Sequence, residues 1–203
     1  MERATVTMAE HEVKIKESRY DELIDTAARI FAAHGFKSTT IQDIAREMNI
    51  TGAAVYYYIK SKDDLLYEIW RRAGKKLQDA VDNIVNSDVS PEEKMRLFFR
   101  SHVNLIIAEK PIFEVLILER SRLPAKGKVT LEDDERRYQE TLSEIIKNLP
   151  AEKVAISEPK ILAFGILAML NGVIRWYAPE DRLSLDEIAD LYFDAFMRGI
   201  LKH

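Results

Sequence analysis

The chain contains no cysteine among its 203 residues. Disulfide frameworks, thiol nucleophiles, cysteine-ligated zinc and iron–sulfur clusters are therefore excluded together. Glycine and proline are also scarce, at 7 and 6 residues, whereas β-sandwiches and barrels need frequent turns. This shortage of turn residues favours long helices and predicts an all-α fold.

Long apolar segments are missing as well. The longest uncharged apolar run covers residues 161–170, whereas a membrane-spanning helix needs about 20 residues. Charged residues interrupt every apolar stretch near the N-terminus, so no secretory signal is expected. The sequence predicts a cytoplasmic protein with no membrane partner.

Catalytic signatures are lacking too. The 4 histidines and 7 glycines are scattered, without a Gly-x-Ser-x-Gly elbow, a His-Glu-x-x-His helix, a phosphate loop or a dinucleotide fingerprint. We therefore expect no enzymatic activity, no catalytic residue, no metal site and no cofactor. The net charge of −4 argues against nonspecific coating of nucleic acid, so any anion-binding surface must be local.

Hydrophobic residues recur at helical spacing through nearly the whole chain. With capping signals such as Ser90-Pro91 and Ser184 before Glu187, this periodicity predicts nine helices and no strand. An exposed loop is expected at 124–128. The expected helices span roughly 20–34, 40–48, 52–58, 61–84, 90–107, 111–123, 131–149, 159–177 and 184–201. The predicted division is a charged extension (1–17), a three-helix domain (18–64) and a C-terminal helical domain (65–203).

Residues 41–58 have the composition of a helix-turn-helix, with two short helices joined by a tight corner. Ala45 is small enough to let the two helices approach each other. Asn49 tolerates the left-handed conformation that a sharp corner requires, and Val55 can fill the joint. The alternative is an ordinary helical hairpin within a non-enzymatic scaffold of packed helices.

The third expected helix carries an unusual outer surface. Thr51, Gly52 and Ala53 are small, so this end of the helix can enter a major groove. Tyrosines follow at 56–58 and cannot all point inward, because successive side chains on a helix differ by about 100°. We expect one of them to be core and the others to contact bases and phosphates. Lys62, beside the N-terminus of the next helix, can neutralise a phosphate.

From 39 to 66 the residues are Thr-Thr-Ile-Gln-Asp-Ile-Ala-Arg-Glu-Met-Asn-Ile-Thr-Gly-Ala-Ala-Val-Tyr-Tyr-Tyr-Ile-Lys-Ser-Lys-Asp-Asp-Leu-Leu. This segment resembles the DNA-binding part of the TetR family of one-component transcriptional regulators, although the family often has His in place of Tyr58 and Phe in place of Ile59. The resemblance implies a repressor that binds a double-stranded DNA operator as a homodimer. It assigns base contacts to Gln42, Thr51, Gly52, Ala53 and Tyr56, and phosphate contacts to Thr40, Tyr57, Tyr58 and Lys62.

The last two expected helices are apolar around most of their circumference, far more than the ~100° that one core contact needs. Two packing partners are therefore implied. One is the subunit's own core, and the other is a symmetry mate, with which the TetR resemblance implies a four-helix bundle. The alternative is a monomer with a large core. The dimer-interface candidates are Ile188, Leu191, Tyr192, Ala195 and Phe196.

The middle helices combine bulky apolar residues with a few isolated polar ones, which is the make-up of a small-molecule cavity. In the TetR family such a cavity holds an inducer that shifts the population away from the DNA-binding state. The ligand-binding candidates are Phe99, His102, Val103, Ile106, Phe113, Leu116, Ile117, Arg120, Phe164, Leu167, Asn171, Arg175 and Trp176.

Two effector chemistries stay open at this stage. The stretch 171–190 is similar to the corresponding passage of TetR-type regulators of fatty-acid degradation, which release DNA on binding long-chain acyl-CoA. A long apolar tube would take the acyl chain, and Arg120, Arg122 or Arg175 at its mouth could meet the CoA phosphates. The alternative is a flat hydrophobic or drug-like effector.

Overall fold

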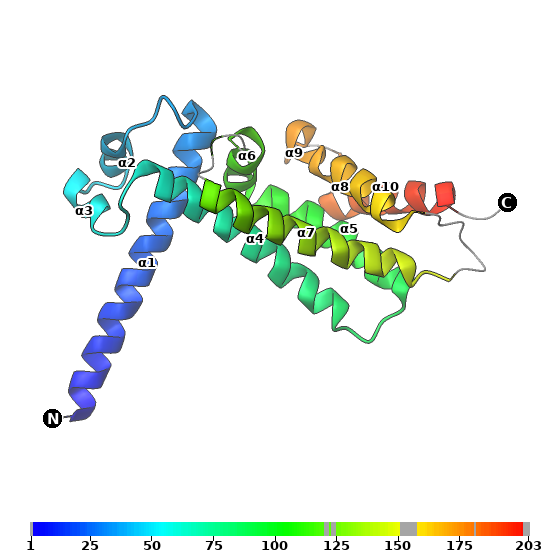
Figure 1. Ribbon diagram of the computed structural model, residues 1–203, viewed down its shortest axis with the longest axis horizontal. Coiled ribbons are helices and arrows are strands. Elements are labelled where there is room, and N and C mark those ends of the chain that lie inside the picture. The colour runs from blue at the N-terminus through cyan, green and yellow to red at the C-terminus, as the bar shows by residue number, and fades with distance from the viewer. Residues whose placement is uncertain (1, 120–121, 123–124, 151–157, 181, 201–203) are drawn as a thin grey trace. The chain divides into compact units, whose positions relative to one another are not determined.

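The computed structural model describes residues 2–119, 122, 125–150, 158–180 and 182–200. Within these residues the chain is helical and has no strand, as predicted (Figure 1). The described helices match the nine predicted, because the one expected over 159–177 is present but interrupted at Gly172. In order they are α1 (Glu2–His34), α2 (Ile41–Glu47), α3 (Gly52–Tyr56), α4 (Lys62–Val85), α5 (Pro91–Ala108), α6 (Lys110–Leu118), α7 (Ala125–Lys147), α8 (Pro159–Asn171), α9 (Val173–Trp176) and α10 (Leu185–Ile200).

The chain forms two compact units that interleave along the sequence. The first comprises residues 1–71 and 111–127, and the second comprises 72–110 and 128–203. Most of α6 therefore folds with the N-terminal helices, whereas the division proposed from the sequence placed all residues after 64 in one C-terminal domain.

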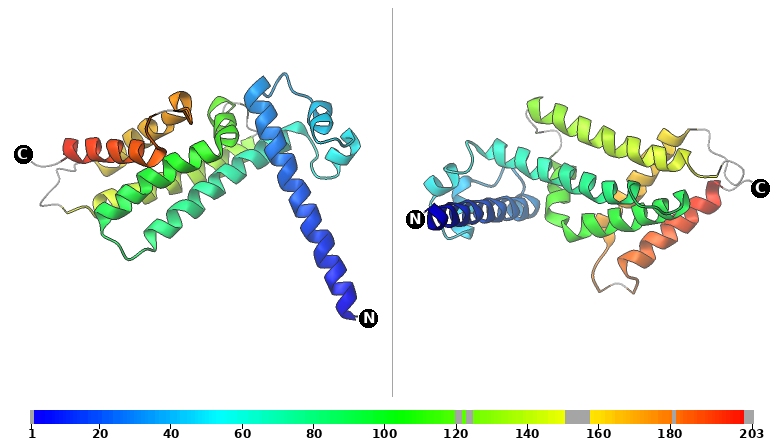
Figure 2. Two further views of the ribbon diagram at one scale, coloured as in Figure 1. Left: turned by 180° about the vertical axis from the view of Figure 1, so that it is seen from behind. Right: turned by 90° about the horizontal axis from the view of Figure 1, so that it is seen from below.

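In the first unit, α1 is one continuous helix (Figure 2). The charged extension expected at 1–17 is the first part of this helix rather than a separate segment. Leu23, Ala27 and Phe31 along its second half are at most 1% exposed, and α1 packs against α2. Gly35 ends the helix with φ +80°, a conformation that a side chain would strain. The second half of α1 thus supports α2, which in turn packs against α3.

In the second unit, α5 is the central helix and packs against α8, α9 and α10. The buried ring of Phe99 lies between those of Phe193 and Phe196, with centroids 5.8 Å and 6.1 Å away. On another side of α5, Phe98 packs on Tyr138 of α7 at 5.3 Å. Burial of these large rings contributes to the driving force for assembling this unit.

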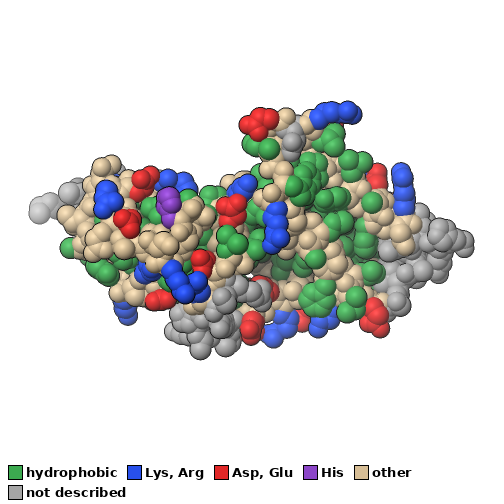
Figure 3. Space-filling view, turned by 90° about the horizontal axis from the view of Figure 1, so that it is seen from above, with side chains coloured by type: hydrophobic (Ala, Val, Ile, Leu, Met, Phe, Trp, Pro, Cys, Tyr) green, Lys and Arg blue, Asp and Glu red, His purple; other side chains and the backbone are tan. Residues whose placement is uncertain are grey.

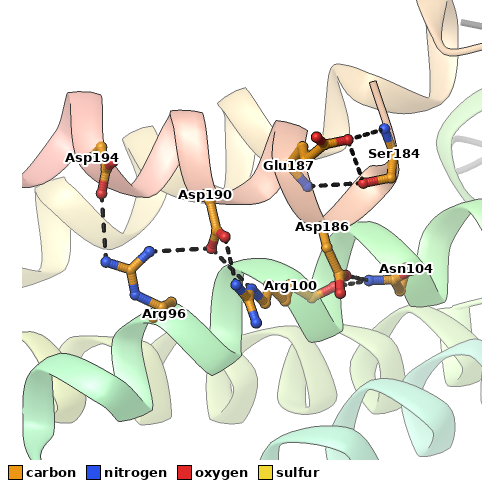
Figure 4. A network of polar contacts seen from close by, with 8 residues as sticks. All are labelled: Arg96, Arg100, Asn104, Ser184, Asp186, Glu187, Asp190 and Asp194. Carbon is orange, nitrogen blue, oxygen red and sulfur yellow. Dashed lines mark hydrogen bonds and ion pairs between the residues drawn. The ribbon is translucent and has the colours of Figure 1, made fainter. Parts of the chain in front are cut away.

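A row of ion pairs and hydrogen bonds joins α5 to α10 (Figure 4). Nε of Arg100 donates to a carboxylate oxygen of Asp190 at 2.8 Å, and Arg96 contacts the same oxygen at 3.2 Å. The hydrogen bond from Arg100 is the main reason that the pKa of Asp190 lies below its usual value, and Arg96 lowers it further. The row consists of Arg96, Arg100 and Asn104 on α5 and Asp186, Asp190 and Asp194 on α10.

Helix boundaries in the middle of the chain differ from the expected ones. The helix predicted over 111–123 ends at Leu118. The loop predicted at 124–128 is wrong, because α7 already begins at Ala125. A proline suits the first turn of a helix as well as a loop, so Pro124 did not distinguish the two outcomes.

Candidate nucleic-acid interface and effector site

The corner between α2 and α3 has the geometry that its residues predicted. Asn49 adopts φ 54°, Ala45 is 3% exposed and Val55 is fully buried. At the start of α2, Oγ1 of Thr40 accepts a hydrogen bond from the Asp43 amide, while the Asp43 carboxylate accepts one from the Thr40 amide. Such a cap contributes about 1 kcal/mol. The two helices therefore form a well-defined helix-turn-helix.

The outer surface of α3 is small at its N-terminal end and aromatic at its C-terminal end. Ala53 is exposed, and the Thr51 side chain caps the helix by accepting from the Ala54 amide at 3.1 Å. The side chains of Tyr56 and Tyr57 are 52% and 68% exposed. Tyr58 is the partly buried tyrosine, and its ring packs 6.4 Å from that of Tyr20 on α1. Two tyrosines are thus available to a partner, and Gln42 on α2 and Gly52 are also at least partly accessible.

Lys62 does not have the free ammonium group that a phosphate contact would use. Its Nζ donates to the backbone carbonyl oxygens of Phe36 at 2.7 Å and of Thr39 at 2.8 Å. It also lies 4.3 Å from the centroid of the Phe36 ring. With two of its three hydrogens committed to the α1–α2 link, Lys62 acts as an intramolecular clamp, and its contact with a phosphate stays a prediction.

A different cation lies beside the recognition helix. Nζ of Lys16 on α1 is 4.8 Å from the centroid of the Tyr57 ring, and Lys16 is exposed. Lys60, in the link between α3 and α4, is also exposed. Sequence reasoning missed Lys16 because only the continuity of α1 brings it to α3. A helical pattern extended upstream of residue 20 would have been the signal.

The last long helices expose apolar residues on one side. Figure 3 shows hydrophobic side chains gathered over part of the molecular surface. We define the apolar patch as Ile161, Phe164 and Ala168 on α8 with Leu191 and Ala195 on α10, all of which are exposed. The stretch Pro159–Trp176 is long and apolar enough to cross a membrane by composition, with a mean hydropathy of 1.2. The same composition is typical of a helix that packs in a protein interface, so it does not by itself indicate a membrane.

Two dimer-interface candidates face the subunit's own core instead. Ile188 is 5% exposed, so it has almost no surface to offer a second chain. Phe196 is partly buried against Phe99 and packs with Leu149. Ile188 and Phe196 lie toward the core side of α10, since residues three or four apart share a face of a helix. Leu191 and Ala195 lie on the exposed side of α10, and Tyr192 is intermediate.

The polar centre of the second unit is a buried histidine. Nδ1 of His102 lies 2.9 Å from the Tyr138 hydroxyl, and Nε2 lies 3.2 Å from Oδ1 of Asn171. Because the amide oxygen can only accept, Nε2 carries the proton and the Tyr138 hydroxyl donates to Nδ1. Burial lowers the pKa of His102 to about 4, against a smaller opposing effect of the Asn171 hydrogen bond. The histidine is therefore neutral at physiological pH, and burial raises the pKa of Tyr138.

The remaining effector candidates fall into three groups. Phe99, Val103 and Ile106 are at most 1% exposed and so form packed core rather than the wall of a water-sized cavity. Leu167 is nearly buried, whereas Phe164, Arg175 and Trp176 are exposed at α8 and α9. The third group, Phe113, Leu116 and Ile117, lies on α6 and belongs to the first unit. Arg120 lies outside the described residues.

Trp70 carries a buried polar atom that sequence reasoning did not single out. Trp70 on α4 is 2% exposed, and its Nε1 is buried without a hydrogen-bond partner in the described part of the chain. An unpaired buried donor costs about 1–3 kcal/mol.

Comparison with known proteins gives consistent matches along the chain. Residues 23–69 match the family described as bacterial regulatory proteins, tetR family, and residues 88–200 match the tetracyclin repressor-like, C-terminal domain. The HTH-type transcriptional repressor KstR2 of Mycobacterium tuberculosis is 25% identical over 91% of this chain and 94% of its own length. The fatty acid metabolism regulator protein of Bacillus subtilis is 23% identical over 58% of this chain and 61% of its own. The structure of AibR in complex with isovaleryl coenzyme A and operator DNA superposes with a TM-score of 0.79 at 24% identity, covering 87% of this chain and 97% of that one.

Proposed function

Because this chain belongs to the TetR family of transcriptional repressors, and is not an enzyme, we propose that it represses its target genes in the cytoplasm as a homodimer released by an acyl-CoA. The observation that carries the DNA-binding part is the exposure of Tyr56 and Tyr57 on a capped recognition helix. Proteins of this family bind operator DNA and a small-molecule ligand, and they act as dimers.

The length of α3 explains why a dimer is needed. Five residues, Gly52–Tyr56, without a charged side chain reach only a few base edges. Two copies placed about one DNA turn apart would give a specific affinity that a single copy lacks. The exposed apolar patch on α8 and α10 supplies a surface for pairing two chains as a helical bundle.

The DNA-binding proposal is tested by selecting duplexes from a random library with the purified protein. Footprinting at ~150 mM salt should show two protected half-sites about one helical turn apart. Tyr56→Ala should weaken binding to the selected site by about 1–3 kcal/mol and should weaken binding to random DNA much less. A chain that binds all duplexes alike, or none, would instead be the non-enzymatic helical scaffold considered above.

An acyl-CoA effector is supported by the chemistry of the second unit. The His102–Tyr138–Asn171 chain is neutral and lies in apolar surroundings, so this region holds no buried charge that would oppose entry of an apolar acyl chain. Arg175 at the end of this region is exposed and can pair with a phosphate of coenzyme A. The AibR complex with isovaleryl coenzyme A and the named role of the Bacillus subtilis relative in fatty acid metabolism favour the same class.

The effector proposal is tested by calorimetry and thermal shift with isovaleryl-CoA, lauroyl-CoA, palmitoyl-CoA and free coenzyme A. One of the acyl-CoAs should bind at micromolar concentration and release the selected DNA. Arg175→Gln should weaken binding of that acyl-CoA and leave binding of the corresponding free fatty acid unchanged. Absence of any shift at ten-micromolar acyl-CoA would rule out this class and leave the flat hydrophobic effector.

A further inference from the structure

The peptide groups on both sides of Phe36 are held by two different helices. The Phe36 amide donates to Oε1 of Glu119 at 3.1 Å, in a buried position at the end of α6. Its carbonyl oxygen accepts from Nζ of Lys62 at the start of α4, at 2.7 Å. The Phe36 ring packs on Phe31 at 5.1 Å. Phe36 is therefore the point at which α1, α4 and the end of α6 meet.

Phe36 belongs to the link that sets the position of α2. The link begins at Gly35, whose carbonyl oxygen accepts from Oγ1 of Thr39 at 3.0 Å. Thr39 is 2% exposed, and its own carbonyl oxygen accepts the second hydrogen bond from Lys62. Thr40 then caps α2. A shift of Phe36 is thus passed through few and well-bonded residues to the helix-turn-helix.

Glu119 is an unusual residue to find in this position. It is 9% exposed, although burial of a carboxylate is costly unless the charge is compensated. Compensation comes from the Phe36 amide and from an ion pair with Arg122. Glu119 directly follows α6, the helix that carries Phe113, Leu116 and Ile117. One side chain therefore ties the end of this helix to the link before α2.

We propose that Glu119 is a positioning residue of the DNA-reading head, which passes the state of α6 to α2 through its hydrogen bond to the Phe36 amide. When the end of α6 moves, this hydrogen bond breaks and the α1–α2 link loses one of its two anchors, while Lys62 keeps the other. The proposal rests on the DNA-binding function above, and it adds a direct route from α6 to the reading head through one named side chain.

The first experiment needs no DNA and no effector. Leu116→Ala perturbs α6, and hydrogen exchange of the Phe36 amide is measured in this variant, in Glu119→Ala and in the double variant, after circular dichroism has shown that each is folded. Alone, each substitution should raise the exchange rate about five- to tenfold, as expected for loss of one buried hydrogen bond. In the Glu119→Ala background, Leu116→Ala should add nothing. Additive effects, or an unchanged rate in Glu119→Ala, would overturn the proposal.

The second experiment uses the selected DNA duplex and the reciprocity of linked sites. DNA binding should slow exchange of the α6 amides in the wild type and in Glu119→Gln, whose side-chain carbonyl can still accept from Phe36. It should not do so in Glu119→Ala. Glu109→Gln, which removes a half-buried carboxylate paired with Lys76 just before α6, is the matched control and should behave as wild type.

Equal protection of α6 in Glu119→Ala and wild type would also overturn the proposal. Failure to select any duplex would count against the proposed function instead. The hydrogen-exchange comparison of the single and double variants, which needs no DNA, would then decide whether Glu119 couples α6 to Phe36.

Discussion

Replacing Lys62 by methionine should destabilise the fold while leaving the salt dependence of DNA binding unchanged. Lys62 donates to the carbonyl oxygens of Phe36 and Thr39. Methionine has no hydrogen to donate, so both hydrogen bonds are lost in the variant. Hydrogen bonds that involve a charged group contribute about 1.5–3 kcal/mol each. Because Lys62 is only partly buried, we expect a total loss of about 2–3 kcal/mol. Methionine retains an apolar stem over the Phe36 ring.

Lys16→Gln is the matched control variant. Lys16 is exposed beside Tyr57, so its substitution should change the free energy of unfolding by less than about 0.5 kcal/mol. If its ammonium meets a phosphate, the slope of log K against log salt should fall by about one per subunit. Denaturant unfolding followed by circular dichroism measures the stability, and fluorescence anisotropy across a potassium chloride series measures the slope.

The opposite pattern would refute the reasoning. Suppose Lys62→Met keeps wild-type stability and loses salt dependence, while Lys16→Gln keeps its slope. The ammonium of Lys62 would then be bound to DNA rather than to the α1–α2 link, and the phosphate assignment made from the sequence would stand.

Three further predictions concern the second unit and α4. Leu191→Glu should yield monomers in sedimentation, because it places a charge in the exposed apolar patch; an intact dimer would move the interface elsewhere. Trp70→Phe should lower stability by about 1–3 kcal/mol, because the cavity left in a fully packed position outweighs the gain from removing an unpaired buried donor; wild-type stability in the variant would show that the core closes around the smaller ring. His102→Gln should reduce the loss of stability between pH 6.5 and 4. The folded state disfavours protonation of His102, whose pKa is lowered to about 4. Stability therefore decreases as the pH is lowered through this window, by up to about 3 kcal/mol. Parallel stability curves of the wild type and the variant would contradict the burial of a neutral histidine.

The sequence was sufficient for the helix-turn-helix because the signals there are local. Ala45, Asn49 and Val55 lie within one short segment, and the size or backbone preference of each residue predicts its place at the corner. At least one of the three adjacent tyrosines had to point outward, and we expected one to be core; Tyr58 is the partly buried one, against Tyr20. Periodicity also gave the helices, since capping and spacing are properties of neighbouring residues.

The polar partners could not be predicted, because a sequence states that a charged residue is present but not what lies opposite it. His102 was recognised as isolated and polar, yet Tyr138, which completes its hydrogen bonds, reads as one aromatic residue in a charged helix. Ile188 and Leu191 looked equivalent on an all-apolar helix, and only packing against α5 assigns the first to the core.

Lys62 illustrates the same difficulty with a functional consequence. Its position at the start of a helix near α3 is where a phosphate anchor would stand, and a local reading cannot exclude that role. Its partners, the Phe36 and Thr39 carbonyl oxygens, belong to the α1–α2 link, and Glu119 reaches the same link from α6. Because the two side chains hold opposite sides of one residue, both shape the α1–α2 link that precedes α2. Lys16 is exposed beside Tyr57, so we expect the lysine that meets DNA and the lysine that shapes the α1–α2 link to be different residues.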